Sequence, residues 1–410
     1  MKNTIKLAVV AALALGATSA FATNGDVMIG QGAKSRAMGG VGIAKSFGAE
    51  SGLVNPANIS SVEKSEATLV ITAFAPNVSF DGPTQMGSTG YQDSSANFSV
   101  IPEIAYATRL TDRAVVGLSM SGTAGMGTDY DSKTGTSNNG SARMKTALSL
   151  LKVAVPVSYT VGGFTAGIAG VLQYGSLQLS HQYGAGFANF RNNGASTDIG
   201  YGLEIGAAYT TGGLTLGAVY KSKIGMTYDN TIGQSLVDFG VSGAITSGDN
   251  LDQPEERGVG ISYSMGANTI SADYKNIAWG DAAGYADFGW ENQDVYAVGY
   301  EYAADSFAVR LGYNYAKSPI VEQADTYVGG VTNFFNLSGF PGIVETHYTV
   351  GGGYNISDAL SLDGSFIYVP EATASYNTTT FTTAVGGTGT SSANVKHSQM
   401  ALTIAGTYKF

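Results

Sequence analysis

The stretch Met400-Ala401-Leu402-Thr403-Ile404-Ala405-Gly406-Thr407-Tyr408-Lys409-Phe410 at the end of the chain decides the class of fold. Its even positions carry Met, Leu, Ile, Tyr and Phe, with Gly406 as the exception, whereas its odd positions carry small or polar residues. Successive side chains of a strand point to opposite faces, so one face is apolar and the other is small and polar. A strand with lipid on one side and a wet lumen on the other needs this arrangement. The stretch therefore predicts a strand of a transmembrane barrel, and we expect the barrel-assembly machinery to recognise its terminal Phe410.

The first residues have the pattern of an export signal. Lys2 and Lys6 provide a positive start, and the apolar run from Leu7 to Ala17 is too short to span a bilayer as a helix. Ala20-Phe21-Ala22 then fits the small-x-small cleavage pattern. We expect a signal peptide over residues 1–22 and, together with the last strand, a location in the outer membrane of a Gram-negative bacterium.

The composition differs from that of an ordinary soluble enzyme. Only 13% of the residues are charged, whereas 57 of the 410 are Gly and 24 are Tyr. Beyond the signal, no run of about 18 apolar residues occurs, which argues against a helical membrane protein. The chain has no Cys, so its stability cannot depend on disulfides. Removal of the signal takes two of the 21 positive residues and none of the 31 negative ones, leaving a net charge of −12, and an acidic chain without a basic cluster argues against nucleic-acid partners.

Short turns and long polar loops alternate along the mature chain. Six tight turns separate segments with a period of two, as hairpins require. Seven longer loops rich in Gly, Asn, Ser, Thr and Asp are expected near 77–96, 123–144, 184–196, 229–255, 281–289, 319–343 and 373–393. Thirteen connections join fourteen strands, and an even number places both ends and all short turns on the periplasmic side. The expected fold is all-β, a 14-stranded antiparallel transmembrane β-barrel over residues 65–410.

Residues 23–64 do not have the pattern of barrel strands. They are dense in Gly from Gly30 to Gly42 and carry the corner Asn55-Pro56-Ala57. A barrel of fourteen strands is wider than one of eight, which side chains alone can fill. We therefore expect residues 23–64 to form an N-terminal plug, or hatch, inside the lumen.

Two motifs in this segment resemble the FadL/TodX family of outer-membrane transporters for hydrophobic compounds. The first is the run Gly32-Ala33-Lys34-Ser35-Arg36-Ala37-Met38-Gly39-Gly40, and the second is Asn55-Pro56-Ala57. The strand count, the plug and the terminal Phe410 extend the resemblance over the mature chain. Gly125-Met126-Gly127-Thr128-Asp129-Tyr130 also resembles the family, although the Pro-Phe usual just before it is absent here.

The resemblance implies passive uptake of hydrophobic molecules through a plug-gated lumenal pocket. Long-chain fatty acids are the favoured ligands, and aromatic or alkane hydrocarbons taken up by the same mechanism are the alternative. Release is implied to occur sideways, through a kink in the third strand, where Gly117 and Gly122 are candidates for the opening. The competing interpretation is that both are ordinary barrel glycines.

Further candidate residues follow from their position. Asn55, Pro56 and Ala57 are candidates for the gate, because Pro56 fixes its own φ and restrains the residue before it; a plain turn is the alternative. Ligand contacts are expected from apolar residues of the plug and from exposed aromatics of the outer loops: Met28, Ile29, Met38, Phe47, Phe187, Phe190, Phe334, Phe335 and Phe340. The loop aromatics would otherwise pack the loops onto the rim of the barrel.

Other functions compete with transport. A general porin would need an open, charged constriction without a plug. An enzyme is not expected, because His181, His347 and His397 form no evident set with nearby Ser and Asp. Four acidic residues between 249 and 256 lack EF-hand spacing and are interpreted as a solvated charge run, so no metal or cofactor is expected. A phage receptor or adhesin role of the loops stays open, and the expected surroundings are outer-membrane lipid and lipopolysaccharide around a monomer.

Overall fold

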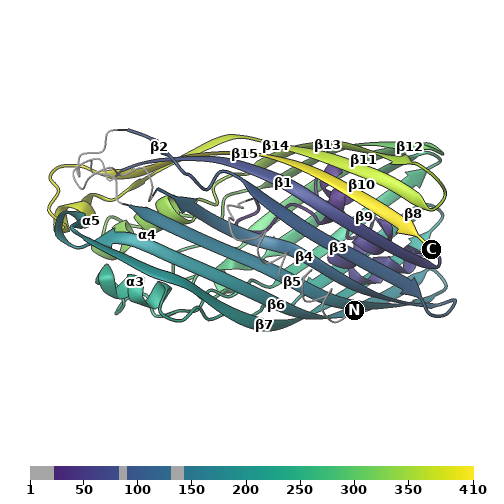
Figure 1. Ribbon diagram of the computed structural model, residues 1–410, viewed down its shortest axis with the longest axis horizontal. Helices are drawn as coiled ribbons and strands as arrows, with labels where there is room; N and C mark the ends of the chain where they lie inside the picture. The colour runs from purple at the N-terminus through teal and green to yellow at the C-terminus, as the bar shows by residue number, and fades with distance from the viewer. Residues whose placement is uncertain (1–22, 83–89, 131–142) are drawn as a thin grey trace.

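The computed structural model describes residues 23–82, 90–130 and 143–410 (Figure 1). Within these residues, fourteen long strands form one antiparallel barrel. They are β1 (Ser65–Asp81), β3 (Ser99–Arg109), β4 (Ala114–Asp129), β5 (Met144–Val161), β6 (Phe164–Tyr183), β7 (Asn189–Thr211), β8 (Leu214–Lys221), β9 (Glu256–Met265), β10 (Asn268–Ile277), β11 (Gln293–Ala303), β12 (Phe307–Ala316), β13 (Thr346–Asn355), β14 (Leu360–Asn377) and β15 (Ser392–Lys409). Consecutive strands pair with one another, and β15 pairs with β1 from Glu66–Lys409 to Asp81–Asn394, which closes the barrel. The predicted architecture is confirmed.

The period-two pattern sets which side chains face lipid. On β12, Phe307, Val309 and Leu311 are exposed, whereas Arg310 and Asn314 are buried in the lumen. The Arg310 guanidinium lies 2.6 Å from Glu301 of β11 and 2.7 Å from Asp363 of β14. An Arg on the lipid face near the middle of the bilayer would instead cost about 2–4 kcal/mol. Charged side chains therefore point into the lumen, and the face towards lipid is apolar.

The wall of the barrel differs in height around its circumference. The strands β8 to β13 have 8 to 11 residues, whereas β6 has 20 and β7 has 23. The loop expected over 184–196 is thus mostly part of β7, which begins at Asn189. The expectation was wrong because hydrogen-bonded pairing with β6 continues above the apolar band, where no alternation of apolar side chains is needed.

Short helices cap one end of the barrel. They are α3 (Ile232–Asp238), α4 (Tyr327–Gly339) and α5 (Thr379–Ala384), with the single turns η4 (Ala185–Phe187) and η5 (Trp279–Asp281); the two-residue strand β2 (Gln92–Asp93) also lies here. Phe239, Phe334, Phe335 and Phe381 pack against one another in the core of this cap. Within the described part of the chain, no helix is long and apolar enough to cross a membrane.

The residues before β1 fill the lumen at the other end. They contain α2 (Gly32–Ala37), η1 (Gly48–Leu53) and η2 (Pro56–Ser61), which Figure 1 shows inside the barrel near the end that carries the C-terminus and the short turns. Almost every side chain from Met28 to Ile59 is buried. The N-terminal plug in the lumen is therefore present, and the outer cap lies at the opposite end.

Candidate functional site

Buried ion pairs hold the middle of the plug to the wall. Arg36 of α2 forms an ion pair with Glu103 of β3 and donates a hydrogen bond of 2.8 Å to Thr72 Oγ1 of β1. The second carboxylate oxygen of Glu103 accepts from the Gly32 N–H at 2.7 Å. Both side chains of the ion pair are fully buried. Removal of one partner would leave an uncompensated buried charge, so this pair resists separation.

Further wall carboxylates meet the plug in the same way. Asp273 of β10 accepts from the N–H groups of Gly42 and Ile43 at 2.8 and 2.9 Å. Lys45 Nζ lies 2.8 Å from Glu301 of β11, and Lys34 Nζ lies 3.6 Å from Asp363 of β14. The inward charges of the barrel thus serve as anchors for the plug.

The corner Asn55-Pro56-Ala57 is fixed against β6 and β7. The Asn55 side chain accepts from the Ala57 N–H at 3.0 Å and donates to the Ile43 carbonyl at 2.8 Å. Glycines on the wall permit the contact: a Cβ at Gly206 would lie 1.9 Å from Asn55 Oδ1, and one at Gly167 would lie 2.3 Å from the Ala57 nitrogen. These contacts hold this corner of the plug in place against the wall.

The start of the plug pairs with β4. The ladder between β3 and β4 ends at Glu103–Ser121, and the register between β4 and β5 shifts by one residue between Gly122 and Ala124. Beyond the shift, Gly125 N–H donates to the Asp26 carbonyl at 3.1 Å, and Met28 N–H donates to the Thr123 carbonyl at 3.3 Å. The segment Asp26–Met28 therefore takes the edge of β4 from which β3 has separated.

The two glycines expected at a lateral opening lie in different surroundings. Gly122 is the last residue before the register shift, and a Cβ there would lie 2.7 Å from Ile101 of β3. Gly117 lies inside the regular β3–β4 ladder, opposite Ala107. The break in the wall is therefore next to Gly122 and away from Gly117.

One carboxyl group connects the start of the plug to the cap. Asp26 is fully buried and accepts hydrogen bonds from the Tyr285 hydroxyl and from Gln253 Nε2, the latter at 3.3 Å. Burial raises the pKa of Asp26 to about 6. The preceding Gly25 has φ +67° and lies against Trp279, where a Cβ would come within 2.6 Å of the indole ring. The Asp26 side chain thus links the segment Asp26–Met28, which pairs with β4, to Gln253 and Tyr285 of the outer loops.

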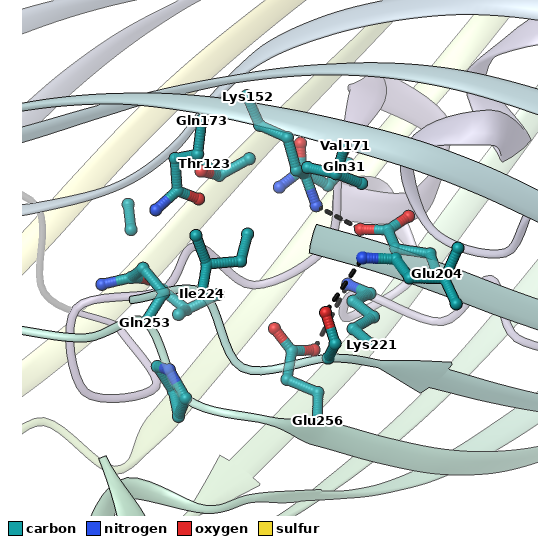
Figure 2. A pocket seen from close by; sticks show the side chains of 15 residues that line it. Gln31, Thr123, Lys152, Val171, Gln173, Glu204, Lys221, Ile224, Gln253 and Glu256 are labelled. Atoms are coloured by element: carbon teal, nitrogen blue, oxygen red, sulfur yellow. Dashed lines mark hydrogen bonds and ion pairs between the residues drawn. The ribbon is translucent and has the colours of Figure 1, made fainter. Parts of the chain in front are cut away.

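A small cavity lies beside the segment Asp26–Met28 (Figure 2). Side chains from the plug, from β4 to β9 and from the loop after β8 surround it: Val27, Gln31, Thr123, Ala124, Lys152, Val171, Gln173, Leu203, Glu204, Lys221, Ser222, Ile224, Gln253, Pro254 and Glu256. Lys152 lies 2.7 Å from Glu204, and Lys221 lies 3.3 Å from Glu256. The cavity volume is about 40 Å³, room for a few water molecules but not for an organic ligand.

The apolar candidates of the plug are buried but do not line this cavity; Phe47 lines another one, between the plug and the wall, with Lys34 and Lys45. Met28 and Ile29 pack with Phe74 and Ile101, and Met38 and Phe47 pack with Val41 and Ala297. Their neighbours Val27 and Gln31 line the cavity instead. The charged cavity residues were not brought together in the sequence analysis, because which inward positions face the same cavity depends on strand register and tilt, which the period of two does not determine.

The loop aromatics were expected to be exposed, and for α4 this was wrong. Phe334 and Phe335 are buried in the core of the cap. Phe340 is half-buried and lines a small apolar pocket with Phe288 and Trp290. Phe190 is 40% exposed, with the Arg143 guanidinium 4.0 Å from its ring centroid. The side chain of Phe187 lies outside the described part of the structure.

One histidine does meet a serine and an aspartate. His181 lies 3.0 Å from Asp238 Oδ2 and 3.4 Å from Ser235 Oγ. Ser235 and His181 are both buried, and the Ser235 hydroxyl donates to the Thr231 carbonyl at 2.9 Å. No substrate could approach this hydroxyl, so the contact ties α3 to β6. Across residues 23–82, 90–130 and 143–410, no group of acidic or histidine side chains is placed to hold a metal ion.

Comparison with known proteins assigns the family. Residues 8–255 match the family model of the outer membrane protein transport proteins (OMPP1/FadL/TodX). A Pseudomonas aeruginosa FadL homologue has a TM-score of 0.70 at 17% identity, covering 94% of this chain and 100% of its own. The Pseudomonas putida toluene transporter TodX has a TM-score of 0.67 at 19% identity, covering 95% of this chain and 100% of its own.

One curated relative matches only a short part of the chain. It is an uncharacterised protein from Chlorobium limicola, encoded in the 5′ region of a phosphoenolpyruvate carboxykinase gene, and it is 35% identical over 114 residues. The match covers 27% of this chain and about half, 54%, of the relative. Its name indicates no activity, so the assignment depends on the family match and the fold. The chain belongs to the OMPP1/FadL/TodX family and is a protein of the Gram-negative outer membrane.

Proposed function

We propose that this protein lets hydrophobic compounds diffuse passively across the outer membrane, and that long-chain fatty acids are its ligands. The observation that carries the proposal is the pairing of Asp26–Met28 with the edge of β4 beside the wall break. Val27 of this segment also lines the lumenal cavity. The segment thus separates the cavity from the break, and its displacement would join them into a lateral path to the membrane.

The path proceeds from the cap to the lumen and then sideways. The apolar pocket under the cap, lined by Phe288, Trp290 and Phe340, is the first apolar surface inside the outer loops. Burial of an alkyl chain in the lumen stabilises it by roughly 0.8 kcal/mol per CH₂. Because the cavity is too small for such a chain, binding requires groups that line it to move, either at the start of the plug or in the chain after β8. Asn55, Pro56 and Ala57 act in this scheme as the fixed pivot of the gate, while the preceding residues move.

The charges of the cavity favour a ligand with a carboxylate over a plain hydrocarbon. Lys152 and Lys221 each pair with a Glu, and the three N–H donors of each ammonium group allow it to bind a fatty-acid carboxylate as well without giving up that Glu. A hydrocarbon offers these side chains no partner. The alternative ligand class, aromatic or alkane hydrocarbons, is supported by the aromatic pocket of the cap.

Uptake of labelled oleate and labelled toluene distinguishes the candidates. Cells would lack the gene, carry the wild-type gene, or carry a variant without residues 23–31. Loss of oleate uptake on deletion, restored by the wild type, would support fatty-acid transport. Restoration of toluene uptake alone would assign the hydrocarbon class. A steady, large conductance of the purified wild type would contradict a gated transporter and favour a porin.

We also propose which partners the barrel meets in the membrane and during assembly. Outer-membrane lipid and lipopolysaccharide would surround the apolar band of a monomeric barrel. The barrel-assembly machinery would recognise β15 with its terminal Phe410. A receptor role of the outer loops is compatible with the cap.

A further inference from the structure

The barrel wall has a second seam, between β7 and the chain that follows β8. The β7–β8 ladder runs from Thr211–Leu214 to Glu204–Lys221 and ends there. One further contact follows, in which Ser222 N–H donates to the Leu203 carbonyl at 2.9 Å and the Leu203 N–H donates to Ser222 Oγ at 2.9 Å. Above it, β7 continues to Asn189 in pairing with β6. The edge of β7 that faces β8 is therefore paired with β8 only along about half of the strand.

The chain after Lys221 passes inside this edge. Its residues alternate, with Lys223, Gly225 and Thr227 exposed and Ile224 and Met226 buried. A Cβ at Gly200 of β7 would lie 2.4 Å from Ile224 Cγ2, and one at Gly202 would lie 2.8 Å from Ile224 Cγ1. The side chain of Ile224 thus lies behind two wall glycines and closes the seam from within.

The seam lies at the depth of the lipid. The apolar outer face of β7 runs from Tyr209 through Leu203 and Tyr201 to Ile199, all of them exposed. Ten residue steps of about 3.3 Å, tilted by about 45°, span about 23 Å, close to the apolar band of about 25 Å in such barrels. Leu203 to Ile199 occupy the outer half of that band. An opening here would face acyl chains rather than water.

The same cavity reaches both breaks in the wall. Thr123 and Ala124 line it at the β3–β4 break, and Leu203, Ser222 and Ile224 line it at the β7 seam. Figure 2 shows Ile224 among the cavity side chains, between Gln253 and the Lys221–Glu204 side. The first break is covered by the backbone of Asp26–Met28. The second is covered by the Ile224 side chain together with the Gly225 carbonyl and Met226, which also lie against Gly200. The two breaks are thus covered by different segments of the chain, so either can open without the other.

We infer that the seam between β7 and residues 222–227 is a second lateral outlet, which passes chain-shaped apolar ligands from the lumen into the outer leaflet. This inference rests on the proposed transport function. Gly200 and Gly202 carry no side chain, so displacement of Ile224 and of the Gly225–Met226 segment from them would open a path for an alkyl chain along the edge of β7. The Lys221–Glu256 and Lys152–Glu204 pairs at its foot hold the polar end of the ligand until the chain has left.

Reversible cross-links test the two outlets separately, because the chain has no native Cys. Val27→Cys with Ala124→Cys would fix the plug segment to β4, since these two residues form a bridge. Asp198→Cys with Thr227→Cys would tie the seam, since Asp198 Oδ2 accepts from the Thr227 N–H at 2.7 Å. Thr210→Cys with Thr215→Cys is the matched control in the regular part of the same hairpin, where the two hydroxyls lie 3.0 Å apart.

Labelled oleate uptake would be measured for each pair in oxidised and reduced form. We expect the β4 cross-link to leave part of the uptake, the seam cross-link to remove part of it, and both together to abolish it, each reversed by reductant. The control pair should change nothing. Complete loss with the β4 cross-link alone, or residual uptake that the seam cross-link does not lower, would overturn the second outlet. Absence of uptake by the reduced protein would instead overturn the transport function itself.

Ile224→Ala supplies an independent variant that shortens the closing side chain. With the β4 cross-link formed, we expect it to raise oleate uptake above that of the cross-linked parent. An unchanged or lower rate in a variant that retains the heat-resistant mobility of a folded barrel would contradict the inference.

Discussion

Replacement of Arg36 by Ala should release the plug without unfolding the barrel. The guanidinium is buried between Glu103 and Thr72, and the substitution leaves Glu103 with the Gly32 N–H at 2.7 Å as its remaining partner in these contacts. Breaking a buried ion pair in this way costs about 3–5 kcal/mol. Since 1.4 kcal/mol changes an equilibrium tenfold, the released form of the plug should become more populated by roughly two to three and a half powers of ten. The strand ladders do not depend on this pair, so the closed sheet should persist.

Two measurements on purified protein check this result. Hydrogen exchange should speed up across residues 32–42 and remain slow in β1 and β15, and planar bilayers should show more frequent openings. Arg257→Ala is a matched control, because Arg257 is an exposed Arg that also pairs with a carboxylate, that of Glu255, and exposed pairs contribute at most about 1 kcal/mol. Exchange and conductance of Arg36→Ala equal to those of the control would refute the view that buried pairs hold the plug.

Three further predictions address the gate, the pivot and the cap. Burial raises the pKa of Asp26 from 3.8 to about 6, so docking of the segment should be strongest below about pH 4, weaken as the pH rises to about 6, and be about 3 kcal/mol weaker above it. Fluorescence of the two Trp residues, which lie next to this segment, should report that change, and Asp26→Asn should abolish the pH dependence. Gly206→Ala should cost about 1–3 kcal/mol by overpacking the pivot and should speed exchange at residues 55–58, whereas Gly170→Ala on the neighbouring strand, with open space around it, should leave exchange unchanged. Phe334→Ala should remove about 3–5 kcal/mol from the cap and make the outer loops sensitive to protease, and Phe190→Ala, at an exposed site, should not.

The strands were predictable wherever lipid imposes a pattern. Leu402 and Ile404 are exposed and Thr403 and Ala405 are buried, as the period of two predicts. Above the bilayer this constraint ends, and β7 extends through Asn192 and Asn193 in pairing with β6. Polar composition there predicted a loop, because hydrogen bonding between strands leaves no trace in residue type.

The helix α4 of the cap was predictable from its first residues. Thr326 caps α4 by accepting from the Gly329 N–H at 3.0 Å, a start signal that predicts a helix over the following residues. A helix with Phe334 and Phe335 on it packs these rings together rather than exposing them. The charged cavity is a different case, since Lys152 and Glu204 lie on β5 and β7 with β6 between them, and which side chains meet across a strand depends on the strand tilt, which the sequence does not display.

The plug consists of two parts that differ in how they are held, and this difference bears on how transport is gated. From Gly32 to Asn58, wall charges and buried side chains of Arg36, Lys45 and Asn55 fix the chain at many points. From Thr23 to Met28, the described polar contacts with the wall and the cap are a short backbone pairing with β4 and the Asp26 carboxyl group, beside the packing of Met28 on Phe74 and Ile101 and of Gly25 on Trp279. A ligand can shift an equilibrium only by its difference in affinity for the two states. Displacement of Gly32–Asn58 would require several buried ion pairs to break. Release of Thr23–Met28 requires only that a few hydrogen bonds break and that the Asp26 carboxyl group, whose charged form is already disfavoured by burial, leaves its site. The free energy available from burying one alkyl chain suits displacement of Thr23–Met28, so we propose that the start of the plug is the moving gate and that the residues from Gly32 onward stay in place.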